Sequence, residues 1–195
     1  MKILKLLFLL LIIISCSSSR DIKLSECLEK KEAELLYEGK NVFEETLIEF
    51  YAKESLEDCY MSYFKDLTLA TDNLFLLESK SKGIDFIKKL KSLNKIKTFW
   101  KKTEVYEDEE QYFPKKGKYL SCLIKLAKTE RFKEFLTMLN KDVSVYVPTL
   151  AGSLYGERGR ETLRKENEVL RIYIAFHFYY ASILNNELKE VKKTI

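Results

Sequence analysis

The chain has 195 residues, of which 46% are hydrophobic, with 34 Lys and Arg residues against 30 Asp and Glu residues. This hydrophobic content excludes a wholly disordered chain, and the near balance of charge gives no reason to expect nucleic acid as a partner. Two prolines and six glycines leave few points at which a helix must stop, so the composition favours long helices.

The first residues have the pattern of an export signal. Lys2 and Lys5 give a positive start, and an unbroken apolar run from Leu6 to Ile14 follows. A membrane-spanning helix needs about twenty apolar residues, so this run is too short to span a bilayer by itself. We expect residues 1–15 to be removed, which leaves a mature chain close to neutral.

The sequence Ile13-Ile14-Ser15-Cys16 resembles the lipobox of bacterial lipoproteins. The resemblance implies that lipid is attached to the Cys16 sulfur, that the chain is cut before Cys16, and that the new amino group is acylated. Because two or more acyl chains anchor a protein stably, the membrane is the expected partner. Ser17 resembles an outer-membrane sorting signal, which favours the outer membrane or the cell surface. The alternative is an ordinary secretory signal followed by a chance cysteine.

Beyond the anchor we expect two parts, a lipidated tether at residues 16–24 and a single α-helical domain at residues 25–195. The tether is serine-rich and lacks apolar periodicity. Ser25 is expected to cap a first helix that stops at Gly39, and a second helix follows over about residues 42–54.

The clearest periodicity predicts one helix of about 24 residues that begins at Leu56. Ser55 and Asp58 before it resemble a capping box. The apolar side chains lie three or four residues apart on a single face: Leu56, Tyr60, Tyr63, Leu67, Ala70, Leu74 and Leu77. Gly83 is expected to separate this helix from the next.

The segment after Gly83 predicts a basic amphipathic helix that runs to about residue 102. Such a helix can lie on anionic headgroups, with a tryptophan at the interface. The candidate membrane-surface contact therefore comprises Lys88, Lys91, Lys95, Lys102 and Trp100. A solvated helix face is the simpler interpretation.

The chain then turns at Pro114 and Gly117. A helix or helical pair is expected from Lys118 to about Lys141, with a break at Thr129. Residues 142–159 are expected to form a loop, because no partner strand is visible for the alternating residues Val143, Val145 and Val147.

A long final helix is expected from about Arg160 to Lys193. It is apolar around most of its circumference, which is typical of a central, buried helix. Its histidine, His177, is the single one in the chain, and a core histidine is the simpler interpretation because a metal site needs several ligands. The alternative is a pocket for an apolar ligand, lined by Tyr173, Phe176, His177 and Tyr180.

Three cysteines remain once Cys16 is set aside, namely Cys27, Cys59 and Cys122. An oxidising compartment could close one disulfide at most and would leave one thiol over. Buried, inert thiols are the preferred interpretation. The sequence contains no CxxC pair, no phosphate-binding loop and no catalytic motif, so no catalytic residue, metal site or cofactor is expected.

Together these elements predict an all-α fold, an irregular bundle of about six or seven helices with a long, mostly buried C-terminal helix. The expected function is non-enzymatic, an interaction or structural role at the cell envelope with a protein partner. The alternative is a carrier or sensor that binds an apolar ligand between helices near the last helix, and a hydrolase is a third option.

Overall fold

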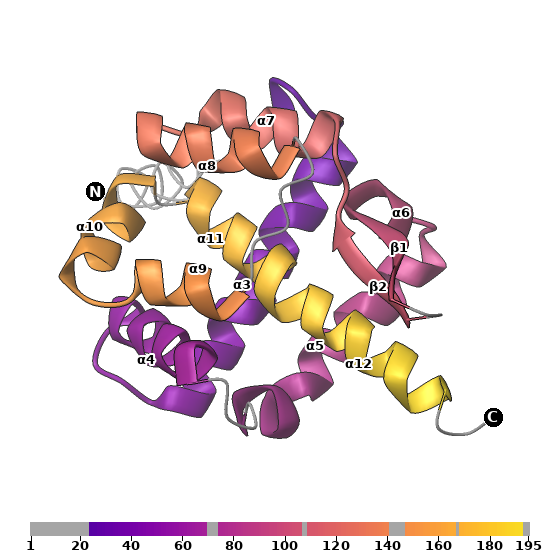
Figure 1. Cartoon of the computed structure of the whole chain (residues 1–195), viewed down its shortest axis with the longest axis horizontal. Coiled ribbons are helices and arrows are strands. Elements are labelled where there is room, and N and C mark those ends of the chain that lie inside the picture. The colour runs from indigo at the N-terminus through magenta and orange to yellow at the C-terminus, as the bar shows by residue number, and fades with distance from the viewer. Residues whose placement is uncertain (1–23, 70–73, 107–108, 141–146, 167, 193–195) are drawn as a thin grey trace, which may run out of the picture.

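The computed structural model describes residues 24–69, 74–106, 109–140, 147–166 and 168–192. Helices form most of the described chain and one small β-hairpin accompanies them, so the predicted all-α bundle is confirmed. In Figure 1 the last helical run crosses the centre of the molecule diagonally, with α3 behind it and the other elements around this pair.

The elements follow one another in short steps along the chain. In order they are α3 (Lys30–Tyr51), α4 (Leu56–Leu69), α5 (Leu74–Ser92), α6 (Ile96–Phe99), β1 (Trp100–Tyr106), β2 (Glu109–Pro114), α7 (Lys118–Leu126), α8 (Glu130–Asn140), α9 (Val147–Leu154), α10 (Glu157–Glu166), α11 (Glu168–Ile174), the π-helical turn η2 (Ala175–Tyr180) and α12 (Ala181–Lys192).

Two glycines expected to interrupt helices lie inside them instead. The helix α3 runs through Gly39, where a Cβ atom would lie 2.8 Å from the rings of Phe176 and Phe86. The helix α5 runs through Gly83, where a Cβ atom would lie 2.5 Å from the Tyr179 hydroxyl oxygen. The predicted stops are therefore wrong, because both glycines serve close packing rather than helix termination.

The helix α3 spans both of the first two expected helices and ends at Tyr51, followed by a C-cap that is not glycine. Ala52 has a φ of 47°, in the left-handed region, and its N–H donates to the Ile48 carbonyl at 2.9 Å. This is the geometry of a left-handed C-cap, which is most often supplied by glycine.

The expected 24-residue helix is divided between two elements. The helix α4 ends at Leu69 and α5 begins at Leu74, while Ala70 lies outside the described residues. The start is as predicted, because the Asp58 N–H donates to the Ser55 hydroxyl at 3.1 Å. The seam within α4 is also confirmed, since Tyr60, Tyr63 and Leu67 are buried and Leu56 packs, partly buried, against the core.

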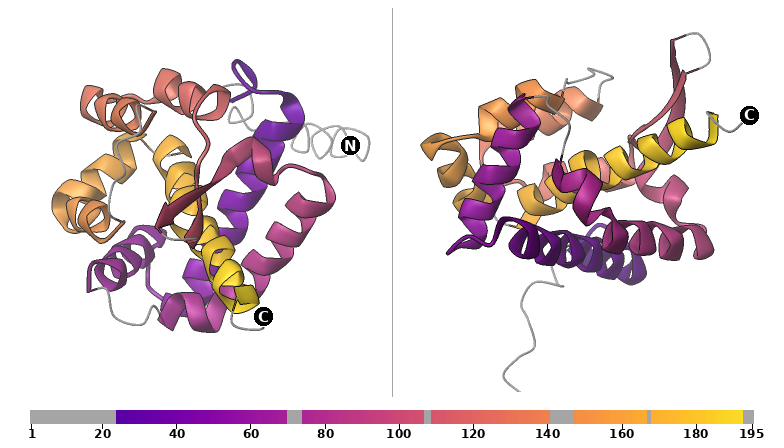
Figure 2. Two further views of the ribbon diagram at one scale, coloured as in Figure 1. Left: turned by 45° about the vertical axis from the view of Figure 1, so that its right-hand side comes forward. Right: turned by 90° about the horizontal axis from the view of Figure 1, so that it is seen from below.

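A β-hairpin made of β1 and β2 begins at Trp100, within the segment that was expected to form the end of the basic helix. Strands β1 and β2 pair antiparallel, from Trp100 opposite Pro114 to Tyr106 opposite Glu109. The side-chain amide of Asn185 in α12 accepts from the Tyr112 N–H at 2.6 Å and donates to its carbonyl at 3.5 Å. The hairpin thus lies along α12, as Figure 2 shows.

The pair α7 and α8 confirms the predicted break near Thr129. The buried carboxylate of Glu166 accepts from the N–H groups of Lys128 and Thr129 at 2.8 and 2.6 Å, at the start of α8. A carboxylate at a helix N-terminus satisfies N–H groups that have no partner within the helix.

The expected loop over residues 142–159 is wrong where the structure describes it, because α9 occupies residues 147–154 and α10 begins at Glu157. Val143 and Val145 lie outside the described residues. The expected final helix corresponds to α10, α11, the π-helical turn η2 and α12, with residue 167 outside the described residues. Its burial is confirmed from Val169 to Leu184, where most side chains are enclosed.

Candidate functional site

A disulfide that could not be assigned from the sequence holds the first described residues to the rest of the domain. The proposed lipidation site, Cys16, lies outside the described residues. The first described residue, Leu24, is only 2% exposed. Three residues later, Cys27 forms a disulfide with Cys122 of α7, and the two Cα atoms are 5.5 Å apart. The expectation of buried free thiols is therefore wrong for this pair and confirmed for Cys59 of α4, which is buried and unbonded.

This disulfide joins residues 95 positions apart and fixes the start of the domain against α7. Closing a loop of that size restricts the unfolded chain and is worth about 4 to 5 kcal/mol in the chain-entropy treatment. Disulfides of this kind form and persist in oxidising compartments.

The structure does not bring the five candidate membrane-contact residues onto one surface. Trp100 is 1% exposed, and its indole N–H donates to the Phe176 carbonyl at 2.9 Å. Its assignment to a membrane interface is therefore wrong. Lys102 lies in β1, whereas Lys88 and Lys91 lie in α5 and are exposed. The expected helix stops at Ser92, so its lysine face does not continue to residue 102.

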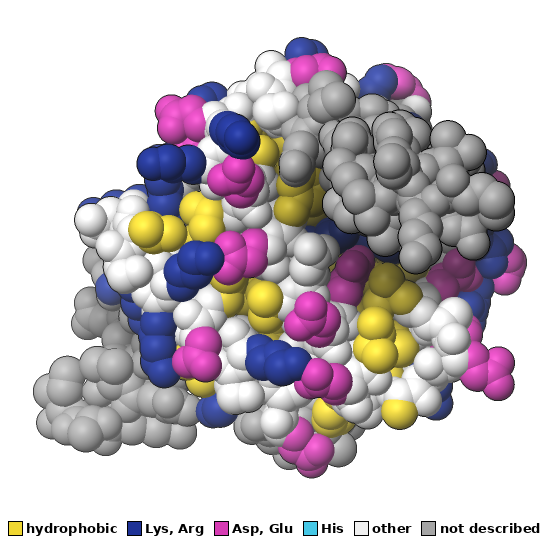
Figure 3. Space-filling view, turned by 180° about the vertical axis from the view of Figure 1, so that it is seen from behind, with side chains coloured by type: hydrophobic (Ala, Val, Ile, Leu, Met, Phe, Trp, Pro, Cys, Tyr) yellow, Lys and Arg dark blue, Asp and Glu magenta, His cyan; other side chains and the backbone are white. Residues whose placement is uncertain are grey.

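Several lysines of this region bond to acids of α3. Ion pairs join Lys82 to Glu49, Lys89 to Glu38 and Lys95 to Glu32, and Lys88 pairs with Asp85 in its own helix. Figure 3, which views the molecule from behind, shows basic and acidic side chains interspersed over the surface. The lysine face of α5 is thus partly a set of interhelical ion pairs.

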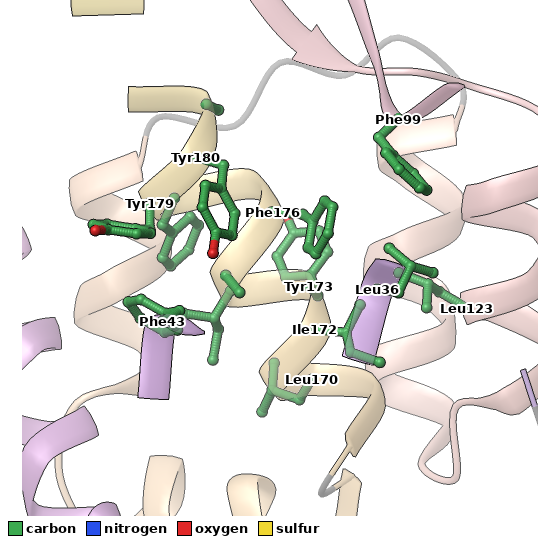
Figure 4. Packing of buried hydrophobic residues seen from close by; sticks show 14 of the residues in the cluster. Leu36, Phe43, Phe99, Leu123, Leu170, Ile172, Tyr173, Phe176, Tyr179 and Tyr180 are labelled. Carbon is green, nitrogen blue, oxygen red and sulfur yellow. The ribbon is translucent and has the colours of Figure 1, made fainter. Parts of the chain in front are cut away.

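The four candidate pocket residues all lie in the core. The Tyr180 hydroxyl donates to the Gly39 carbonyl at 2.8 Å, and the Phe176 ring stacks on Trp100 with centroids 5.3 Å apart. Figure 4 shows Tyr173, Phe176 and Tyr180 among other buried apolar side chains. Two of the four, Phe176 and Tyr180, are therefore engaged in joining elements of the fold.

His177 has a different environment, between two tyrosine rings. Its imidazole stacks on Tyr173 at 4.2 Å and on Tyr119 at 5.9 Å between centroids. Both ring nitrogens of His177 and the Tyr119 hydroxyl are buried without a hydrogen-bond partner in the described part of the chain. His177 also lies in η2, and π-helical turns occur frequently at functional sites. This cluster of His177, Tyr119 and Tyr173 is the candidate site.

Burial sets the protonation of the cluster. Desolvation lowers the pKa of His177 to about 3, so the imidazole is neutral at physiological pH. Desolvation also raises the pKa of Tyr119 well above its usual value, so this phenol keeps its proton. The cluster therefore presents neutral hydrogen-bonding groups in apolar surroundings.

A second polar group lies between α3, α4 and α11. The Lys40 ammonium, 3% exposed, is 2.7 Å from Glu168 and 3.6 Å from Glu44. The Tyr60 hydroxyl donates to Glu44 at 3.1 Å, and Arg171 pairs with the same carboxylate. Two cations thus neutralise two carboxylates, and the groups hold three helices together. The sequence did not indicate this network, because Lys40 and Glu168 are 128 positions apart.

The described residues contain no group of three or more His, Cys, Asp or Glu side chains placed to hold a metal ion. In the same part of the chain, no helix combines the length and apolarity that crossing a membrane requires. Comparisons with protein-family models, with curated proteins and with solved structures give no match.

Replacing His177 with Phe should remove a pH dependence of stability. The folded pKa of about 3 lies below the unfolded value of about 6.5, so the stability contribution is complete above pH 6.5 and lost towards pH 3. Between pH 7 and 5 the free energy of unfolding should fall by about 2 kcal/mol in the parent chain. Urea denaturation at both pH values measures this difference.

Because His177 is the single histidine, few other side chains titrate in that range. The His177→Phe variant should lose most of the difference, whatever its absolute stability. An equal fall in both proteins would contradict the burial of a neutral imidazole.

Removing the disulfide should destabilise the domain strongly. Replacing Cys27 and Cys122 with Ala should lower the free energy of unfolding by about 4 to 5 kcal/mol, because the unfolded chain gains freedom. The matched control is Cys59→Ala, which keeps the disulfide and should cost less. Peptide mapping without reductant on protein from the native host checks the pairing, and a free thiol at both positions would contradict it.

Proposed function

We propose that this chain is a bacterial envelope lipoprotein, anchored through lipid on Cys16, whose helical domain has a non-enzymatic interaction or structural role. The observation that carries the proposal is the disulfide between Cys27 and Cys122. Such a bond suits an exported protein, which is also what the lipobox-like sequence ending at Cys16 implies. The two features are independent, since one is a local sequence pattern and the other a contact within the fold.

The state of the remaining cysteine supports the same proposal. Cys59, a residue of α4, is 0% exposed and lies in the core. A buried thiol is protected from oxidation and from intermolecular pairing, which an exposed thiol in an oxidising compartment would meet. Every cysteine then has a role that fits export: lipid attachment, a disulfide, or core packing.

The described surface supports contact with a partner through mixed polar and apolar groups. Large hydrophobic side chains that are about half exposed lie on separate elements or links: Ile48, Leu69, Leu93, Met138 and Tyr155. In Figure 3 apolar side chains form small areas between charged ones. Non-obligate protein interfaces are about as polar as the rest of a protein surface, so this surface suits a reversible partner better than a permanent one. The outer membrane or the cell surface is the proposed location.

Replacing Cys16 with Ala should block maturation. The variant should accumulate in the host as a larger precursor, because there is no thiol to carry lipid and no lipidated substrate for cleavage. Metabolic labelling with palmitate, followed by electrophoresis, measures both effects. Cys59→Ala is the matched control and should mature and take up label normally. Palmitate in the Cys16→Ala protein would refute lipidation at this position.

A second candidate function is a carrier or sensor of a small apolar ligand. The unpartnered polar atoms of His177 and Tyr119 favour it, because a ligand with hydrogen-bonding groups could pair with atoms that the protein leaves without partners. Native mass spectrometry of the mature full chain, purified gently from its host, tests this function. The carrier predicts extra mass that leaves on denaturation and is lost in His177→Phe. A mass equal to the lipidated chain alone would argue against it.

A further inference from the structure

We propose that one corner of the domain faces the membrane and contacts anionic lipid headgroups. This basic corner consists of Lys95 at the N-cap of α6, Lys97 within α6, Lys115 after β2, and Lys118 at the start of α7. The inference rests on the proposed function, because it requires lipid on Cys16.

Contacts between three chain segments assemble the basic corner. The Lys115 N–H donates to the Phe99 carbonyl at 2.8 Å, and the Lys115 ammonium donates to the Lys97 carbonyl at 2.8 Å. Lys95 and Lys118 both pair with Glu32 of α3, at 3.3 and 3.8 Å. Lysines that are scattered in the sequence are thereby gathered where α3, α6 and α7 begin.

The tether ends at this corner. Leu24 is buried, and the disulfide of Cys27 holds the entering chain to Cys122, one helical turn after Lys118. Seven residues lie between Cys16 and Leu24, so eight Cα–Cα steps join them and reach at most about 28 Å in any conformation. The basic corner is therefore held within that distance of the lipid.

The opposite end of the domain is further away than the tether can reach. The helix α3 starts beside the entering chain, and its 22 residues extend for about 33 Å. Its C-terminal end thus lies beyond the full stretch of the tether. This geometry selects the basic corner, rather than the far end of α3, as the part that meets the bilayer.

The charge of the basic corner suits an anionic surface. The acids Glu29 and Glu32 lie there and pair with Lys118, and Glu32 also pairs with Lys95. Lys97 and Lys115 are exposed, and neither pairs with an acid among the residues that the structure describes. The corner therefore has more positive than negative charge. Anionic lipids attract such groups within about 8 Å, which the tether allows.

Lysine labelling on vesicles tests the orientation. The mature lipidated chain is reconstituted into vesicles of phosphatidylcholine, with or without one third phosphatidylglycerol, and acetylation of each lysine is followed by mass spectrometry. Lys97, Lys115 and Lys118 should be acetylated several-fold more slowly on the anionic vesicles. Exposed lysines near the C-terminal end of α3, far from the tether, should be unaffected, namely Lys53 and Lys65.

Paired variants separate charge from nonspecific burial. In the double variant Lys97→Glu with Lys115→Glu, Lys118 should be acetylated equally on both vesicles. In the control Lys53→Glu with Lys65→Glu, Lys118 should stay protected on the anionic vesicles. Continued protection of Lys118 in the first variant would contradict an electrostatic contact at this corner.

Flotation of the vesicles distinguishes the two proposals. A chain that floats with both vesicle types, yet shows equal acetylation on both, overturns the orientation and leaves the lipid anchor in place. A chain that does not float with neutral vesicles overturns the anchor and, with it, the orientation.

Discussion

The fold depends on the close approach of α3 to the last helical run, which position 39 permits because glycine has no Cβ atom. The Phe176 ring occupies the space that a Cβ atom would need, and the Tyr180 hydroxyl bonds to the Gly39 carbonyl. The Phe176 residue also stacks on Trp100 and accepts its indole N–H, which brings the start of the hairpin to the same point. One small residue thus allows three parts of the chain to meet in a densely packed core.

Features with a local cause could be predicted from the sequence. The cap formed by Ser55 and the apolar pattern that predicts burial of the last helical run depend on residues within a few positions of one another. The break near Thr129 was also predicted, although Glu166, 37 positions away, binds the Thr129 N–H group. Features with a distant cause could not. Glycine both ends helices and admits close packing, and the neighbours of Gly39 in the sequence do not distinguish these uses. The hairpin is held by Asn185, which is 73 positions from Tyr112.

Some features of the candidate site could likewise be predicted from the sequence, and others could not. The apolar stripe through His177 predicted its burial, and the structure places it in the core. The unpartnered ring nitrogens of His177 and its stacking on Tyr119 of α7 have no signal in the sequence. Trp100 was assigned to the wrong surface because the amphipathic pattern was extended past Ser92, where the helix ends. The sequence did not determine which cysteines pair, because three cysteines allow several pairings and their spacing does not choose between them.

The end of the domain at which the chain enters is linked to the core through α3. A domain held by lipid transmits any load through the residues where the tether enters, and burial of Leu24 alone would let this segment fray. The disulfide to α7 prevents fraying, and the pairs of Lys118 with Glu29 and Glu32 join α7 to the first turn of α3. Two turns further along α3, Gly39 packs against Phe176. In the proposed lipoprotein, covalent and packed contacts therefore connect the tether to the centre of the fold, and the domain would follow its anchor as one body.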